Sequence, residues 1–202
     1  MSKINFMKKL LLVLSVCVSI STNSFSQGFF RKLTQKLEFG IKAGGNYSDF
    51  DGANFSTDPL AGFHAGATVA FNVTNNFLVQ QEFLFSMQGA KVLSGPLGAQ
   101  EIKLSYINVP ILLKYRTNSG FFVEAGPQVS IKVKEDVLGL NNIDFAKKID
   151  FGVAGGLGYQ SKIGLGIGAR YVYGIQKVLE TPSVALDDLK NNNIQASIFY
   201  KF

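Results

Sequence analysis

The sequence contains a single histidine, His64, and any hydrolytic site would have to be built around it. Ser48 and Asp150 are residue types that would complete a serine hydrolase triad, and the strand pattern described below places all three near one rim of the folded sheet. A triad requires the base to lie within hydrogen-bond reach of the nucleophile, which residue types alone do not establish. A lone histidine in a polar interior is usually a hydrogen-bonding filler, so we predict no enzyme and no catalytic residue.

Two further segments suggest ligand sites on first reading. Residues 49–58, DFDGANFSTD, carry three carboxylates, but an EF-hand loop counted from Asp49 would need Gly and Glu where Asn54 and Leu60 stand. The glycines of GGLGYQSKIGLGIGAR, residues 155–170, recur largely at every second position. A phosphate-binding loop instead leads from a strand into a helix. We therefore expect neither a dedicated metal site nor a nucleotide site, and no cofactor.

The first 26 residues have the layout of a secretory signal peptide. Lysines precede an apolar run from Leu10 to Ile20, and Ser24 and Ser26 occupy the positions that a signal peptidase reads. The run is too short to cross about 30 Å of hydrocarbon as a helix. Residues 1–26 are therefore predicted to be cleaved, which leaves 202 − 26 = 176 residues.

The only cysteine, Cys17, lies inside this leader. A lipoprotein signal would acylate it, but Val16 stands where a small residue is expected, which makes lipidation the less favoured interpretation. The mature chain then has no cysteine, so disulfides and thiol chemistry do not contribute. Loss of three leader lysines lowers the formal charge from +6 to +3 and leaves no basic stripe, so no nucleic acid is expected as a partner.

The rest of the chain repeats one pattern eight times, in which apolar and polar residues alternate with the period of a β-strand. The predicted strands cover residues 37–48, 62–73, 77–89, 104–116, 121–132, 149–160, 164–174 and 193–202. Their apolar faces carry no charged residue, and Gln81 is the only amide there. Short turns rich in Asn, Ser and Gly alternate with long connections. We predict an all-β fold, an eight-stranded antiparallel up-and-down β-barrel.

The strand length indicates where this barrel resides. Strands of about ten to twelve residues, tilted by about 40°, span roughly 25 Å, the height of the apolar band of an outer-membrane barrel. A secreted lipocalin-like barrel also alternates over eight strands, but it would turn its charged face outward. A glycine-crowded polar face, aromatic residues near the strand ends and the final YKF, residues 200–202, favour the membrane barrel. We predict an outer-membrane protein with short periplasmic turns and long extracellular loops.

The polar faces of the strands must fill the inside of this barrel. An eight-stranded barrel is just wide enough for side chains to fill it, whereas a diffusion porin needs about sixteen strands, more than 176 residues can supply. Lys114 and Glu124 flank a three-residue hairpin loop at 118–120 symmetrically, so they should face each other across the hairpin. The ion-pair network predicted to close the periplasmic half of the lumen consists of Glu82, Lys114, Glu124, Arg170 and, nearby, Lys201.

Eight segments together resemble the PorT-like outer-membrane β-barrel family, which has OmpA/OmpX-type architecture in Gram-negative bacteria. The segments are GIKAGGNYS (40–48), GFHAGATVAF (62–71), QQEFLFSMQGAK (80–91), INVPILLKY (107–115), FVEAGPQVS (122–130), DFGVAGGLGYQ (150–160), ARYVYGI (169–175) and YKF (200–202). The resemblance runs from about Phe39 to Phe202. It implies an outer-membrane location. It implies a role only weakly, because one founding member serves protein secretion while most relatives have no assigned activity.

The expected role is that of a structural or surface-interaction barrel with a filled, non-porin lumen. The alternative is an accessory component of a protein secretion or assembly machinery that acts through secretion-system proteins. Other expected partners are outer-membrane lipids, lipopolysaccharide and the barrel-assembly machinery, for which Tyr200 and Phe202 have the form of the recognition signal. Residues 27–36 are expected to be a short periplasmic lead segment. Residues 37–202 are expected to form a monomeric barrel.

The leader generates the first test. Mass spectrometry of the protein purified from outer membranes should find Gln27 as the first residue, because the lysine-rich start and the Ser24/Ser26 site direct cleavage there. An intact N-terminus upstream of Gln27, or a lipid on Cys17, would contradict this prediction.

Overall fold

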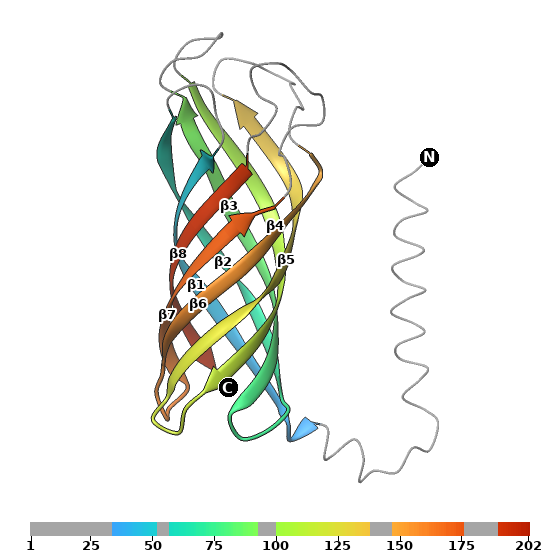
Figure 1. The fold of residues 1–202 in the computed structure, drawn as a ribbon, viewed down its shortest axis with the longest axis vertical. Coiled ribbons are helices and arrows are strands. Elements are labelled where there is room, and N and C mark those ends of the chain that lie inside the picture. The colour runs from blue at the N-terminus through green and yellow to red at the C-terminus, as the bar shows by residue number, and fades with distance from the viewer. Residues whose placement is uncertain (1–33, 52–56, 93–99, 138–146, 176–189) are drawn as a thin grey trace, which may run out of the picture. The chain divides into compact units, whose positions relative to one another are not determined.

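The computed structural model describes residues 34–51, 57–92, 100–137, 147–175 and 190–202. The predicted leader lies outside these residues. The strands are β1 (Leu37–Asp51), β2 (Thr57–Asn72), β3 (Phe77–Val92), β4 (Gln100–Arg116), β5 (Phe121–Val137), β6 (Ile149–Gln160), β7 (Leu165–Gly174) and β8 (Lys190–Lys201). They form one closed antiparallel barrel in chain order (Figure 1). This architecture confirms the predicted fold class. No helix within the described residues is long and apolar enough to span a membrane.

The predicted strands are correct in number and order, but six of them are too short at one end, whereas the predicted bounds of β6 and β7 at that end match the structure. The structure extends β1 to Asp51 and β5 to Val137, and it begins β4 at Gln100 instead of residue 104. Each of these extensions lies at the end of the barrel that carries the long connections, opposite the short turns (Figure 1). The alternation of apolar and polar residues fades there, while backbone pairing continues. Periodicity therefore marks the apolar band rather than the full hydrogen-bonded strand.

The two faces of the sheet are distributed as in a membrane barrel. Large apolar residues such as Leu113 and Phe121 are exposed on the outside, at 56% and 63%. Charged residues such as Glu82 and Arg170 are buried inside, at 0% and 4%. A secreted lipocalin-like barrel would have the opposite arrangement, so the structure decides between the two interpretations that alternation alone left open.

Two inward aromatic rings fill the end of the lumen near the short turns. The rings of Phe122 and Phe199 lie edge to face, with centroids 5.8 Å apart. A Cβ atom at Gly158 would approach Phe122 Cζ to 2.5 Å, and one at Gly166 would clash with Phe199 Cζ. The glycines of β6 and β7 are thus the space into which these rings pack. This is why glycine recurs on the inward face of residues 155–170, the segment that superficially resembles a phosphate-binding loop.

The turn between β4 and β5 sets the register of the inward charges. Thr117 N donates a hydrogen bond to Phe121 O at 2.8 Å, and Gly120 has a φ of 100°, which a residue with a side chain rarely adopts. This turn places Lys114 directly opposite Glu124, as the symmetric spacing predicted.

The antiparallel register shifts once between β2 and β3, where the sequence pattern gave no signal. Pro59 pairs with Ala90 and His64 pairs with Ser86, so β2 has one residue more than β3 between these pairs. Such a β-bulge leaves backbone groups without their ladder partners. Asn46 Nδ2 bonds to Phe63 O and Met87 O, both at 3.0 Å, and thereby satisfies carbonyls at the bulge.

The outward apolar face generates the second test. Phe83 lies near the middle of β3, on the outside, and is 49% exposed. Phe83→Arg should lower the free energy of unfolding in lipid by about 2–4 kcal/mol, because a cation at the bilayer midplane is poorly solvated. Denaturant unfolding of the reconstituted barrel measures this, with Phe83→Leu as the matched control. A loss of unfolding free energy for Phe83→Arg that is no larger than the loss for Phe83→Leu would contradict an outward, lipid-facing position.

Candidate functional site

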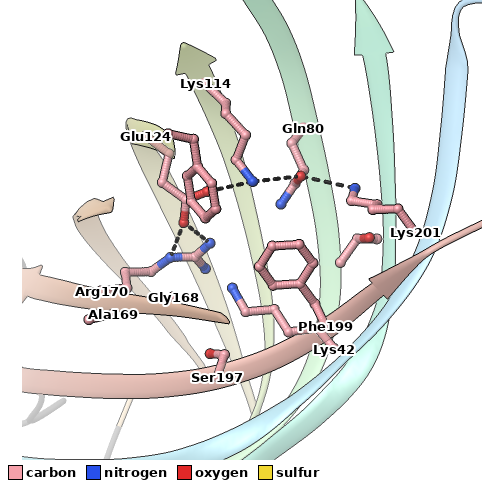
Figure 2. Close-up of a pocket in the computed structure, with 12 residues that line it drawn as sticks. Lys42, Gln80, Lys114, Glu124, Gly168, Ala169, Arg170, Ser197, Phe199 and Lys201 are labelled. Atoms are coloured by element: carbon pink, nitrogen blue, oxygen red, sulfur yellow. Dashed lines mark hydrogen bonds and ion pairs between the residues drawn. The ribbon is translucent and has the colours of Figure 1, made fainter. Parts of the chain in front are cut away.

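Arg170, on β7, is the centre of an ion-pair network in the lumen. Its Nη1 and Nη2 donate to the two carboxylate oxygens of Glu82 at 2.7 and 2.9 Å. Its Nε and Nη2 also donate to Glu124 Oε1, at 3.0 and 2.5 Å. One guanidinium group therefore joins a carboxylate from β3 to a carboxylate from β5. Figure 2 shows its contact with Glu124. Planar, bidentate guanidinium contacts of this kind are among the strongest hydrogen bonds in proteins.

Lysines surround this centre. Lys114 Nζ lies 3.1 Å from Glu124 Oε2 and 3.9 Å from the centroid of the Phe122 ring, so it has both a carboxylate and an aromatic face. Lys114 and Lys201 both donate to Gln80 Oε1, at 3.2 and 3.0 Å (Figure 2). Lys42 Nζ lies 3.3 Å from Glu82 Oε1. We call these residues the lumen cluster: Lys42, Gln80, Glu82, Lys114, Glu124, Arg170 and Lys201.

The structure brings the predicted charges together and adds residues that sequence reasoning missed. Glu82, Lys114, Glu124 and Arg170 form a continuous set of ion pairs, and Lys201 joins them through Gln80. Lys42 was visible only as one more inward charge, because its partner lies two strands away. Its own neighbour on β2 is Gly66, which has no side chain to block the path to Glu82.

A separate ion pair lies nearer the mouth on the side of the short turns. Arg116 Nη2 and Nη1 donate to the two oxygens of Glu38, at 2.8 and 3.1 Å. Its Nη1 also donates to Gln160 Oε1 at 3.0 Å. The two side chains are 18% and 21% exposed, so this pair is in partial contact with water. Arg116 is inward by parity and could have been added to the predicted charges.

Above the lumen cluster, His64 is the centre of a neutral network. Its Nδ1 lies 2.6 Å from Asn46 Oδ1, and its Nε2 lies 2.8 Å from Ser197 Oγ. The amide nitrogen of Asn46 donates to Ser86 Oγ as well as to the carbonyls at the bulge, so its oxygen is the atom that faces the ring. Nδ1 therefore carries the proton, and Nε2 accepts the hydrogen bond from the Ser197 hydroxyl.

This geometry differs from the hydrolytic arrangement considered from the sequence. Both ring nitrogens are taken by Asn46 and Ser197, so neither Ser48 nor Asp150 completes a triad with His64. Ser48 instead exchanges hydrogen bonds with the backbone of Gly89, and Asp150 accepts one from Phe151 N. The sequence pattern did not predict the contact between Ser197 and His64, because it forms only when the barrel closes.

The Ser197–His64–Asn46 chain has the hydrogen-bond order of a serine hydrolase triad. Ser197 lines an internal cavity, but that cavity has a volume of about 10 Å³, roughly the space of one water molecule. An acyl substrate does not fit there, so the hydrogen bonds among Ser197, His64 and Asn46 serve to satisfy buried polar groups. Within the described residues, no three His, Cys, Asp or Glu side chains are placed to hold a metal ion.

The end of β8 joins β1 and carries the predicted assembly signal. Phe202 N donates to Phe39 O at 2.8 Å, and the Phe202 side chain is 75% exposed on the outside. Its ring stands edge to face with that of Tyr200, at a centroid distance of 5.4 Å. Recognition of these two residues during assembly stays a prediction.

Known proteins share this architecture. A family model described as outer membrane protein beta-barrel domain matches residues 25–180. The structure of Neisserial surface protein A is similar, with a TM-score of 0.51 and 19% identity over 83% of this chain and 97% of that one. OprG from Pseudomonas aeruginosa has a TM-score of 0.51 and 18% identity over 82% of this chain and 95% of that one. At these identities the two structures show the fold alone. No curated protein matches the chain in sequence.

The lumen cluster generates the third test. Glu124→Ala should lower the free energy of unfolding by about 3–5 kcal/mol, less any relief from lumen water, because Lys114 and Arg170 lose a buried carboxylate. Adding Lys114→Ala should recover part of that loss, since one uncompensated cation is removed. Denaturant unfolding of the folded barrel measures both values.

Glu38→Ala is the matched control, because it removes a carboxylate from a partly exposed pair and should cost about 1 kcal/mol or less. Equal losses for Glu38→Ala and Glu124→Ala would contradict the assignment of the buried cluster as the stabilising one.

Proposed function

The chain belongs to the outer membrane protein beta-barrel domain family, and on this premise we propose that it acts as a structural or surface-interaction barrel whose lumen is closed. The observation that carries the proposal is the double contact of Arg170 with Glu82 and Glu124 across the interior. These residues come from β7, β3 and β5, so their side chains occupy the cross-section of the lumen instead of leaving a channel.

The energetics support a permanently closed lumen. A solute that passes through would have to separate ion pairs whose members are buried, and separating one partner from such a pair typically costs about 3–5 kcal/mol. The rings of Phe122 and Phe199 pack beside the same cluster and remove further space. Both barriers would have to open together for diffusion through the barrel.

The strand ends at the long connections support a role in surface contacts. Each of β3, β5 and β6 has an exposed lysine at or beside its end near these connections: Lys91, Lys134 and Lys148. An ammonium group on a strand end that extends beyond the apolar band suits the phosphate groups of lipopolysaccharide, one of the expected partners. We expect the long connections on this side to face the cell exterior, with the short turns in the periplasm.

An accessory role in protein secretion is the second candidate, and it rests on the resemblance to PorT-like proteins rather than on a contact of the described residues. Gentle solubilisation of native outer membranes followed by affinity purification separates the two roles. We expect the barrel without stoichiometric secretion proteins. Their recovery in fixed ratio would instead support the accessory role.

The closed lumen generates the fourth test. In planar bilayers the wild-type barrel should show no steady, large conductance, because Arg170 spans the interior. Arg170→Ala should raise the frequency of brief openings, since Glu82 and Glu124 then lose the cation between them. Lys162→Ala, in an exposed turn, is the matched control and should behave as wild type. A steady wild-type pore would contradict the proposal.

A further inference from the structure

The lumen cluster contains more positive than negative charge. Its cations are Lys42, Lys114, Arg170 and Lys201, and its carboxylates are Glu82 and Glu124. All six side chains are buried, with no residue more than 8% exposed. The nearby carboxylate of Glu38 is already held by both terminal nitrogens of Arg116. Four cations against two carboxylates leave a surplus of two positive charges in the interior.

The surplus is concentrated on one side of the cluster. Arg170 contacts both carboxylates, and Lys114 lies against Glu124. Lys42 approaches the oxygens of Glu82 only at 3.3 and 3.4 Å, the long end of the range for an ion pair. The bond of Lys201 goes to the neutral oxygen of Gln80, which also accepts a bond from Lys114. Lys42 and Lys201 are therefore the cations with the weakest compensation.

The hydroxyl group of Thr68 lies beside Lys201, on the side of the cluster where the surplus charge is concentrated. Thr68 is 2% exposed, and its Oγ1 has no hydrogen-bond partner among the described residues. A Cβ atom at Gly40 would lie 2.9 Å from Thr68 Oγ1 and 2.8 Å from Lys201 Cδ, so these two side chains meet over that glycine. Gly40 pairs with Lys201 on one side and with Thr68 on the other. A buried hydroxyl without a partner is costly, which indicates that it has one that the chain does not supply.

Lys42, Thr68 and Lys201 line one internal cavity of about 10 Å³. Figure 2 shows the ammonium groups of Lys42 and Lys201 on either side of the Phe199 ring, within the ring of lining residues. A space of this size admits one water-sized particle and excludes phosphate, sulfate or a carboxylic acid. Lys201 and Thr68 meet over Gly40, and their ammonium group and hydroxyl are donors that suit an anion.

We propose that this cavity binds a single monatomic anion, chloride under natural conditions, between Lys201 and Thr68. The anion offsets half of the surplus charge and accepts the hydrogen bond of the Thr68 hydroxyl. This site lies within the closed lumen. Anion binding there would be an additional property of the protein, separate from its proposed structural role.

Salt-dependent stability tests the proposal. The thermal unfolding midpoint of the full-length barrel, folded in a zwitterionic detergent, is measured in sodium chloride, sodium bromide and sodium gluconate at one fixed ionic strength. We expect a saturable rise of the midpoint in chloride and bromide relative to gluconate. At a concentration ten times the dissociation constant, the ratio of folded to unfolded protein should increase about elevenfold.

Two variants assign the effect to the cavity. Thr68→Val keeps the shape of the side chain but removes the hydroxyl, and it should weaken the halide dependence. Lys201→Gln should abolish it. Lys162→Gln removes an exposed lysine outside the cavity and should keep the wild-type dependence. Crystals grown in bromide should give an anomalous peak between Lys201 and Thr68 in the wild type and none in Lys201→Gln.

Two results would overturn the proposal. One is an unfolding midpoint that is the same in chloride, bromide and gluconate, with no anomalous peak in the cavity. The other is an unfolding midpoint that does not depend on the anion but rises with pH through the alkaline range. That rise would show that the cluster loses its surplus by releasing a proton from a lysine, because the unfolded chain would then bind more protons than the folded one.

Discussion

Closure of eight strands into a barrel removes the inward face from bulk solvent, and the rest of the structure depends on how that face balances its charges. The ion pairs of the lumen cluster join different strands, so its charges are balanced across the lumen. Arg170 shows this most clearly, because it joins carboxylates on β3 and β5 from its own position on β7. The same contacts that pair these charges also tie distant strands together.

The aromatic and glycine positions follow from this central cluster. The Lys114 ammonium lies over the ring of Phe122, whose edge meets Phe199. Both rings can approach the cluster only because β6 and β7 present glycines, such as Gly158 and Gly166, where other strands present side chains. The Lys114 ammonium, the two phenyl rings and the glycines that leave space for them thus pack as one unit. A larger residue at either glycine would displace a ring and, through it, the cations that it contacts.

The sequence predicted the features that depend on local period and missed those that depend on barrel geometry. The period of two assigned each side chain to the inner or outer face, and one tight turn was enough to pair Lys114 with Glu124. The reach of Lys42 across Gly66 to Glu82 depends on strand tilt and on the stagger between strands, which alternation does not encode. The same holds for His64 and Ser197, which are 133 residues apart and meet only after β8 closes against β1.

The β-bulge between β2 and β3 shows how the neutral network and the backbone support each other. Asn46 could satisfy its polar atoms with side chains alone, yet it also holds the carbonyls of Phe63 and Met87. A residue that fills both roles cannot turn to another partner, so its oxygen stays directed at His64.

The two parts of the lumen differ in how completely their polar groups are satisfied. Toward the short turns, the ion pairs of the lumen cluster satisfy most polar atoms. Toward the long connections, both polar atoms of Asn108, Asn193 and Gln195 are buried without a hydrogen-bond partner in the described part of the chain. Buried amides of this kind are normally hydrated in folded proteins. Water therefore belongs to the half of the lumen beneath the long connections, and the lumen cluster is the layer at which that water must stop.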